Sequence, residues 1–151
     1  MQVPESAAAA HQRLERLRVK EHPHCFVCGA PAGRLGVTFA VRSDSSVEAT
    51  FECADLFQGY PGKIHGGIIS SLLDAAMTQC LFARGEVAVT AELAVKFKKP
   101  VLTGRSATVT ARMLNDYYPL YVMEAELLQD GSVAATATGK FMHLESREPA
   151  R

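Results

Sequence analysis

Hydrophobic and polar residues alternate along most of the chain after residue 36, and one long segment interrupts the alternation. Val37, Phe39 and Val41 alternate with polar or small neighbours, and the same pattern returns at 47–51 after a Ser-Asp-Ser-Ser turn. A period of two is typical of strands that bury one face. Further strands are predicted at 91–97, 104–114, 120–128 and 132–143, with Asp130-Gly131 as the tight turn between the last two.

The interrupting segment runs from His65 to Arg84 and is too long for a strand. Two glycines open it, Gly85 closes it, and apolar residues cover nearly all its faces, which is typical of a helix buried on most sides. Such a helix must be wrapped by the sheet. The pattern therefore predicts an α+β fold, with an antiparallel sheet of about five to six strands around one central helix at about 65–84.

The chain divides into three parts. Residues 1–21 hold an alanine run and a weakly amphipathic stretch, which predict an N-terminal helical arm. Residues 22–144 are expected to form a single domain, since 151 residues with 48% hydrophobic content fit one core. Its first part, 22–36, is rich in Pro and Gly and is expected to be a loop. Residues 145–151 are expected to be a flexible tail.

Charge and hydropathy exclude several classes of partner. Sixteen Lys plus Arg balance sixteen Asp plus Glu, whereas a nucleic-acid binder normally carries a basic excess. No stretch approaches the roughly 20 apolar residues of a membrane helix, and the chain starts without a basic leader. We therefore expect a cytoplasmic protein with no nucleic-acid or membrane partner, whose four cysteines are free thiols.

The neutral total conceals a basic strip at 84–112, which holds six Lys or Arg against two Glu. Within this strip, three of the four positions from 96 to 99 are lysines, namely Lys96, Lys98 and Lys99. These lysines are candidates for binding a small anion such as a phosphate. The alternative is that they keep an exposed face of the sheet in solution.

Candidate chemistry concentrates at the predicted helix. The backbone N–H groups of Gly66 and Gly67 have no partner within the helix, and its dipole favours negative charge there, so this end is a candidate oxyanion hole. Asp74 stands alone among Leu and Ala, where a carboxylate is costly unless it is hydrogen-bonded or used. Thr78, four residues later, shares its face of the helix.

The two groups lie too far apart to act on one carbonyl within one chain. From Gly66 to Asp74 the helix rises roughly 12 Å, at ~1.5 Å per residue. A two-fold dimer with antiparallel helices would bring the glycine end of one helix beside Asp74 of the other. The spacing therefore predicts a homodimer, with a homotetramer as an extension.

The triplet His65-Gly66-Gly67, followed by Asp74 in LLDAAM, resembles the hotdog-fold acyl-CoA thioesterases. The strand TAELAVKFKKPVLTG at 90–104 supports the same resemblance, which covers roughly residues 37–144. The similar branch contains the phenylacetic-acid-pathway and 4-hydroxybenzoyl-CoA thioesterases. The resemblance implies hydrolysis of an acyl thioester to a carboxylic acid and free CoA, with no cofactor beyond the CoA of the substrate.

The resemblance also implies roles for particular residues. Gly66 would donate its N–H to the thioester carbonyl, and Asp74 of the opposite subunit would act as general base or nucleophile. His65 either contributes to acid–base chemistry or only orients the turn. Further catalytic candidates are an upstream amide, Gln58, and a hydroxyl on the helix or the next strand, Thr78 or Thr90. The candidate substrate-binding residues are Gly67, Thr90, Lys96, Lys98 and Lys99.

Three rival functions remain open. A noncatalytic acyl-CoA binding module would keep the fold without needing the acid, and a hotdog dehydratase or hydratase would need a His–Asp pair. A zinc-dependent module would use the potential ligands at 22–28, namely His22, His24, Cys25 and Cys28. Four ligands within seven residues differ from the two separated pairs of ordinary structural zinc sites, so no metal is expected.

Overall fold

The computed structural model describes residues 5–29 and 34–145. Its central element is the helix α2 (Gly66–Ala83), one residue shorter at each end than the predicted segment. By length and composition alone α2 could cross a membrane, but two thirds of it is buried inside the protein. Twelve of its residues, from Ile69 to Ala83, are buried, so the expectation of a helix enclosed on most sides is confirmed.

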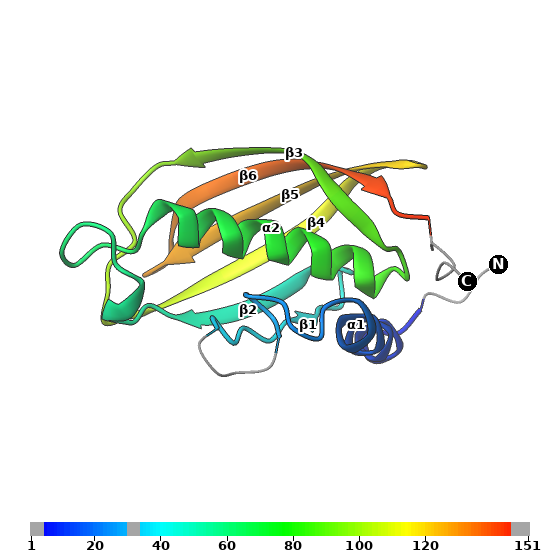
Figure 1. Ribbon diagram of the computed structural model, residues 1–151, viewed down its shortest axis with the longest axis horizontal. Helices are drawn as coiled ribbons and strands as arrows, with labels where there is room; N and C mark the ends of the chain where they lie inside the picture. The colour runs from blue at the N-terminus through cyan, green and yellow to red at the C-terminus, as the bar shows by residue number, and fades with distance from the viewer. Residues whose placement is uncertain (1–4, 30–33, 146–151) are drawn as a thin grey trace, which may run out of the picture.

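Six antiparallel strands form one sheet in the order β1-β2-β4-β5-β6-β3 (Figure 1). The strands are β1 (Ala40–Val41), β2 (Val47–Glu52), β3 (Ala88–Phe97), β4 (Ser106–Tyr117), β5 (Leu120–Gln129) and β6 (Ser132–His143). β1 is shorter than the predicted 37–41 strand, because the backbone N–H of Val37 donates to the carbonyl of Val27 in the preceding loop. β3 and β1 are the two edges.

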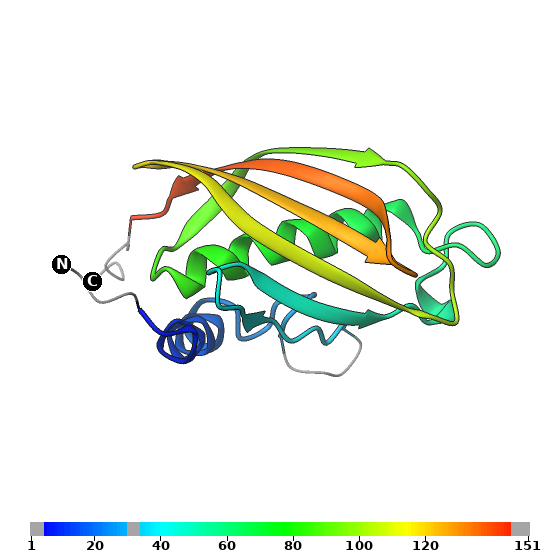
Figure 2. The ribbon, with the colours of Figure 1, turned by 180° about the vertical axis from the view of Figure 1, so that it is seen from behind.

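The curved sheet wraps around α2 on one face, as both ribbon views show (Figures 1 and 2). The four long strands β3 to β6 and β2 all contact the helix. On the helix side Leu72, Leu73 and Met77 are fully buried, and they meet the inward residues of the strands, such as Leu127 and Phe141. Burial of each such side chain contributes about 1.5–3 kcal/mol. The predicted α+β architecture is confirmed.

The N-terminal segment forms the helix α1 (Ala7–Glu21), and a short 3₁₀ turn, η1 (Asp55–Phe57), precedes the glycine-rich loop. Ser6 caps α1, since its hydroxyl accepts from the N–H of Ala9 at 3.2 Å. α1 packs against α2 and buries Leu14 completely, so the predicted arm is docked on the domain. The predicted tail at 145–151 lies, except for Glu145, outside the described residues.

Two predicted turns are confirmed by their backbone geometry. Asp130 and Gly131 both have positive φ, 51° and 75°, which is the conformation of a type I′ hairpin turn. In the Ser-Asp-Ser-Ser turn, Ser45 has φ 68° and Asp44 accepts hydrogen bonds from the N–H and hydroxyl of Ser46. These hydrogen bonds hold the pKa of Asp44 below its ordinary value.

Candidate functional site

The first turn of α2 presents a backbone N–H without a partner. His65 is the N-cap, and its Nδ1 accepts from the N–H of Gly67 at 2.8 Å, while its own N–H donates to the carbonyl of Phe57. The N–H of Gly66 has no acceptor within the part of the chain that the structure describes. Since the helix dipole adds partial positive charge here, Gly66 offers a ready donor to an oxyanion.

A hollow of about 380 Å³ opens beside this turn. It is lined by the loop and the start of α2, namely Gly59, Tyr60, Lys63, Ile64, His65 and Gly66. On the other side, the ring of Phe97 lies 3.6 Å from the position that a Cβ on Gly66 would take. Sequence reasoning missed Tyr60, Lys63 and Phe97, although two of them lie in the same glycine-rich loop.

Asp74 is half-buried on α2, and its carboxylate is held from the neighbouring strand. Its Oδ1 accepts a 2.7 Å hydrogen bond from the hydroxyl of Thr90 on β3. A charged acceptor makes this one of the stronger hydrogen bonds in a protein. Thr90 therefore orients Asp74, and of the two hydroxyl residues that the resemblance suggested, Thr78 and Thr90, it is the one that contacts the carboxylate.

A β-bulge brings Thr90 to that position. The pairing of β3 with β6 shifts register between Thr90 and Glu92, which leaves Ala91 as an extra residue. Strict alternation would put Thr90 on the outer face with Glu92, but the bulge turns it to the inner face, opposite the buried Phe141. The bulge thus re-aims a hydroxyl towards the carboxylate on the helix.

Two candidate residues have their polar atoms engaged in local structure. The hydroxyl of Thr78 donates to the backbone carbonyl of Asp74 at 3.2 Å, and Thr78 is buried, so its hydroxyl is engaged by the helix backbone and not by the carboxylate. The Oε1 of Gln58 accepts from the N–H of Gly62 at 3.1 Å and closes the glycine-rich loop. Gln58 lies at the glycine end of α2, far along the helix from Asp74.

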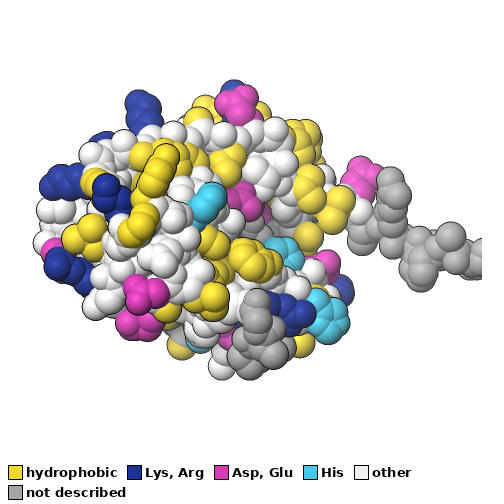
Figure 3. Space-filling model, turned by 60° about the vertical axis from the view of Figure 1, so that its left-hand side comes forward, with side chains coloured by type: hydrophobic (Ala, Val, Ile, Leu, Met, Phe, Trp, Pro, Cys, Tyr) yellow, Lys and Arg dark blue, Asp and Glu magenta, His cyan; other side chains and the backbone are white. Residues whose placement is uncertain are grey.

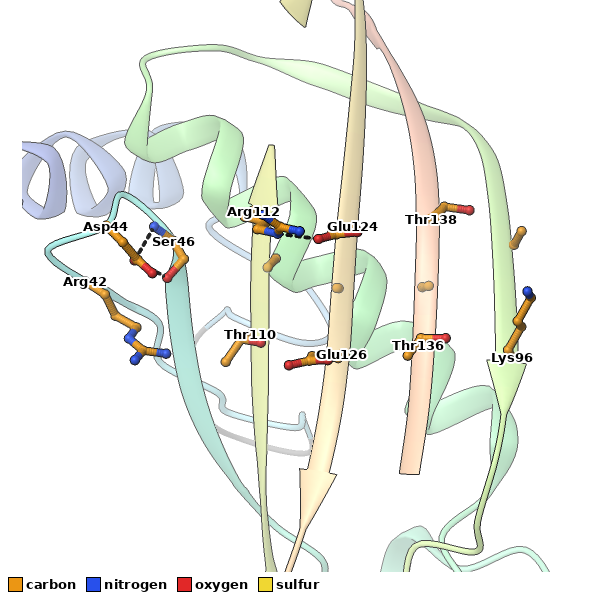
Figure 4. A pocket seen from close by; sticks show the side chains of 14 residues that line it. Arg42, Asp44, Ser46, Lys96, Thr110, Arg112, Glu124, Glu126, Thr136 and Thr138 are labelled. Atoms are coloured by element: carbon orange, nitrogen blue, oxygen red, sulfur yellow. Dashed lines mark hydrogen bonds and ion pairs between the residues drawn. The ribbon is translucent and has the colours of Figure 1, made fainter. Parts of the chain in front are cut away.

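Only one of the three candidate lysines lines the groove on the sheet. Lys96 lines a groove of about 560 Å³ on the outer face of the sheet, with Thr136 and Thr138 (Figure 4). Lys98 and Lys99 instead follow Phe97 and are exposed at the end of α2 that carries Gly66. Lys and Arg side chains gather beside exposed apolar ones on the face that Figure 3 turns forward. The assignment of the three lysines to anion binding stays a prediction.

The structure keeps the two halves of the candidate site apart within one chain. Gly66 and Asp74 lie on the same helix, eight residues and roughly 12 Å apart. No second chain is present in the structure, so the predicted pairing of the two halves stays a prediction.

The cysteine-rich loop after α1 forms a second group of polar side chains. The ligand atoms of His22, Cys25 and Cys28 lie within 4.8 Å of one another, whereas His24 is exposed and outside this group. Burial raises the pKa of Cys28 to about 12 and lowers that of His22, whose shift is partly offset by the negative charges of Glu21 and Asp74. Burial also raises the pKa values of Cys53 and Cys80, each to about 11.

Comparisons with known proteins agree with this picture. Residues 61–115 match the family model described as the thioesterase superfamily. Acyl-coenzyme A thioesterase THEM4 of Mus musculus is 29% identical over 120 residues, which are 76% of this chain and 52% of that protein. The chain thus spans about half the length of this relative. Its match to acyl-coenzyme A thioesterase THEM4 of Rattus norvegicus covers 30% of that protein.

Two solved structures show the same fold. The PaaI protein of the phenylacetic acid degradation operon of E. coli superposes with a TM-score of 0.78 at 21% identity, over 93% of this chain and 97% of that one. A Streptococcus mutans protein, solved bound to acetyl CoA, has a TM-score of 0.68 at 23% identity. The match covers 74% of this chain and 91% of that protein. The predicted hotdog fold is confirmed by these superpositions.

Proposed function

Because residues 61–115 match the thioesterase superfamily and the chain has the hotdog fold, we propose that it is an acyl-CoA thioesterase, which hydrolyses an acyl thioester to a carboxylic acid and free CoA. The observation that carries the proposal is the unpartnered N–H of Gly66 at the positive end of the helix that also bears Asp74. The acetyl CoA bound to the similar Streptococcus mutans protein supports the choice of carrier.

The proposed active unit is a dimer paired along β3. This strand is an edge of the sheet, and all its residues except Ala88 and Val95 are exposed. Leu93 and Phe97, on the face towards α2, are 36% and 56% exposed. A long, apolar, unpaired edge is a template for a second strand. Antiparallel pairing of two β3 strands would cover these side chains and bring Gly66 of one subunit to Asp74 of the other.

The proposed reaction is a single displacement at the thioester carbonyl. Asp74 accepts a proton from water as the water oxygen bonds to the carbonyl carbon, and the N–H of Gly66 stabilises the negative charge that develops on the carbonyl oxygen. The C–S bond then breaks, and the proton passes to the CoA thiolate. The alternative is that an Asp74 oxygen attacks the carbonyl carbon and the C–S bond breaks, which forms an anhydride and releases the CoA thiolate; water then hydrolyses the anhydride, and a proton from that water passes to the thiolate.

The other residues have supporting roles in this proposal. Thr90 holds one carboxylate oxygen of Asp74 and leaves the second for water. His65 positions the helix start through its bond to Gly67, and that bond occupies Nδ1, which disfavours the dehydratase alternative. Lys98 and Lys99 lie beyond Phe97 at the same end of α2, where cationic side chains would attract the phosphates of CoA.

The test is turnover of an acyl-CoA panel, followed with a thiol reagent. Asp74→Asn keeps the size of the side chain and removes the base, so kcat is expected to fall by 10² or more. Unchanged turnover in a folded Asp74→Asn protein would contradict the mechanism. Ligand-induced stabilisation by acyl-CoA without any hydrolysis would instead establish the noncatalytic binding module.

Isotope labelling distinguishes the two routes for Asp74. In a single turnover in H₂¹⁸O with enzyme in excess, the general-base route labels the acid product at once. In the nucleophilic route, attack of water on Cγ of Asp74 in the anhydride leaves an unlabelled oxygen from Asp74 in the first product, and the label enters the enzyme instead. An unlabelled first product together with labelled Asp74, both measured by mass spectrometry, therefore identifies the nucleophilic route.

A further inference from the structure

The loop that follows α1 gathers three metal-ligating side chains that the proposed reaction does not use. His22 is the C-cap residue of α1, and Cys25 and Cys28 follow within the next turn of chain. Their ligand atoms all lie within 4.8 Å of one another, with Cys28 buried and the other two half-buried. Imidazole nitrogen and two sulfurs are the ligand types that Zn²⁺ prefers in proteins.

We propose that His22, Cys25 and Cys28 bind one Zn²⁺ ion, with the side chain of Gln79 against the fourth position. Tetrahedral zinc, with Zn–S of about 2.3 Å and Zn–N of about 2.0–2.1 Å, places a nitrogen and a sulfur ligand about 3.6 Å apart. The Nδ1 of His22 and the Sγ of Cys28 lie 3.6 Å apart. The spacing of these two atoms thus fits a shared metal ion without rearrangement.

Gln79 on α2 places a fully buried amide beside the three ligand side chains. Its side chain is fully buried, and its Nε2 lies 3.2 Å from the Sγ of Cys28. Its Oε1 is buried without a hydrogen-bond partner among the described residues. A buried amide oxygen left unpaired costs about 1–3 kcal/mol. Turning the amide by 180° directs this oxygen towards Cys28, where a cation would satisfy it.

The backbone of the loop holds both cysteines in place before any metal binds. The N–H of Cys25 donates to the carbonyl of His22, and the N–H of Gly29 donates to the carbonyl of Cys25 at 2.9 Å. A Cβ on Gly29 would lie 2.5 Å from that same carbonyl oxygen, so the turn admits only glycine there. Such a tight turn explains how ligands crowded into seven residues converge on one point.

The charge of a zinc site formed by two cysteines is compatible with burial. Two thiolates and one Zn²⁺ sum to zero, so the buried site would carry no net charge, whereas an isolated buried thiolate is costly. The expectation of no metal in this loop rested on ligand spacing along the chain, and the folded turn removes that objection. Bound zinc would connect the end of α1 and the loop after it to Gln79 on α2.

The experiment uses the full chain without an affinity tag, purified with a reductant, incubated with Zn²⁺ and passed through gel filtration. We expect one zinc per chain by mass spectrometry of the metal, and a lower Tm after removal by a strong chelator. His22→Ala and Cys25→Ser should lose the zinc. His24→Ala, in the same loop but outside the cluster, is the matched control and should retain it.

Binding of Co²⁺ to the wild-type chain tests the proposed zinc site even if a variant fails to fold. Co²⁺ added to the reduced wild-type chain should give the intense visible bands and thiolate charge-transfer absorption of a tetrahedral site with sulfur ligands. Absence of these bands together with absence of retained zinc overturns the proposal. Equal zinc content in His22→Ala and His24→Ala also overturns the proposal. So does a reduced protein that binds no metal and whose Cys25 and Cys28 form a disulfide on oxidation.

Discussion

Replacing Gly66 by proline removes one backbone N–H and changes little else. Gly66 is the first residue of α2, where proline is favoured because the helix needs no N–H there. The preceding residue, His65, has φ −59° and ψ 133°, the extended conformation that a following proline requires. The hydrogen bonds of His65 to Phe57 and Gly67 do not involve the deleted group.

The expected loss is that of one oxyanion donor. Removing such a donor typically lowers kcat by 10²–10³, or about 2.7–4 kcal/mol of transition-state stabilisation, with a small effect on KM. Gly66→Ala is the matched control, since it keeps the N–H and adds the same Cβ. That Cβ would lie at an ordinary contact distance of 3.6 Å from the ring of Phe97, so the control should fold normally.

The assay is steady-state release of CoA, measured with a thiol reagent at saturating acyl-CoA for the wild type and both variants. Circular dichroism and Tm establish that both variants are folded. The reasoning is refuted if folded Gly66→Pro turns over as fast as Gly66→Ala, because the N–H would then contribute nothing to the transition state.

Four other predictions follow from the structure. Thr90→Val should lower kcat about tenfold, since Asp74 loses the hydroxyl that orients it. Leu93→Lys, which puts a charge on the edge strand, should shift the protein from dimer to monomer in gel filtration with light scattering. Gly139→Ala should lower the free energy of unfolding in urea by about 1–3 kcal/mol, because its Cβ would lie 2.7 Å from the buried ring of Phe141. Cys53 and Cys80, with pKa values of about 11, should resist alkylation at pH 8, where about one thiol in a thousand is ionised.

Each of these predictions has a control and an outcome that contradicts it. Thr90→Ser keeps the hydroxyl, and a loss as large as that of Thr90→Val would show that orientation of Asp74 is not the cause. Leu114→Lys is the control for Leu93→Lys, because Leu114 on β4 is 41% exposed and Leu93 is 36% exposed, but Leu114 lies away from the edge strand. The Leu114→Lys protein should stay dimeric. Gly66→Ala is the unstrained control for Gly139→Ala. Urea should expose all four thiols, so equal alkylation without urea would contradict burial as the protecting factor.

The elements of the fold were predictable because their periodicity is local. The apolar run of α2 and the alternation in β5 each report burial directly, and the burial of β5 alternates along its whole length. β3 shows where such reasoning fails. Its predicted inner residues Leu93 and Phe97 do lie on the helix side, but they are exposed because the strand is at the sheet edge. Edge position depends on strand order, which periodicity does not report.

The candidate site was predictable only in part. Asp74 and Gly66 stood out because a lone carboxylate and a glycine pair are unusual on an apolar helix. The contact of Thr90 with Asp74 depends on a bulge, and the shift that this bulge causes in the alternation is not visible in the sequence, because the residues around it, Thr90, Ala91 and Glu92, are small or polar. The convergence of His22 with Cys28 likewise depends on a turn whose path is set by backbone hydrogen bonds.

α2 forms the centre of the core and also carries both groups assigned to the reaction, the N–H of Gly66 and the carboxylate of Asp74. Because one helix has both roles, the changes that the protein can accept during evolution are limited. A substitution on its buried face, at Leu72 or Met77 for example, alters stability before it alters the substrate. Adaptation to a new acyl group must therefore draw on positions that surround the helix without supporting it. The exposed positions of the loop at 58–64, such as Tyr60 and Lys63, are of this kind, so related proteins with different substrates should differ there most.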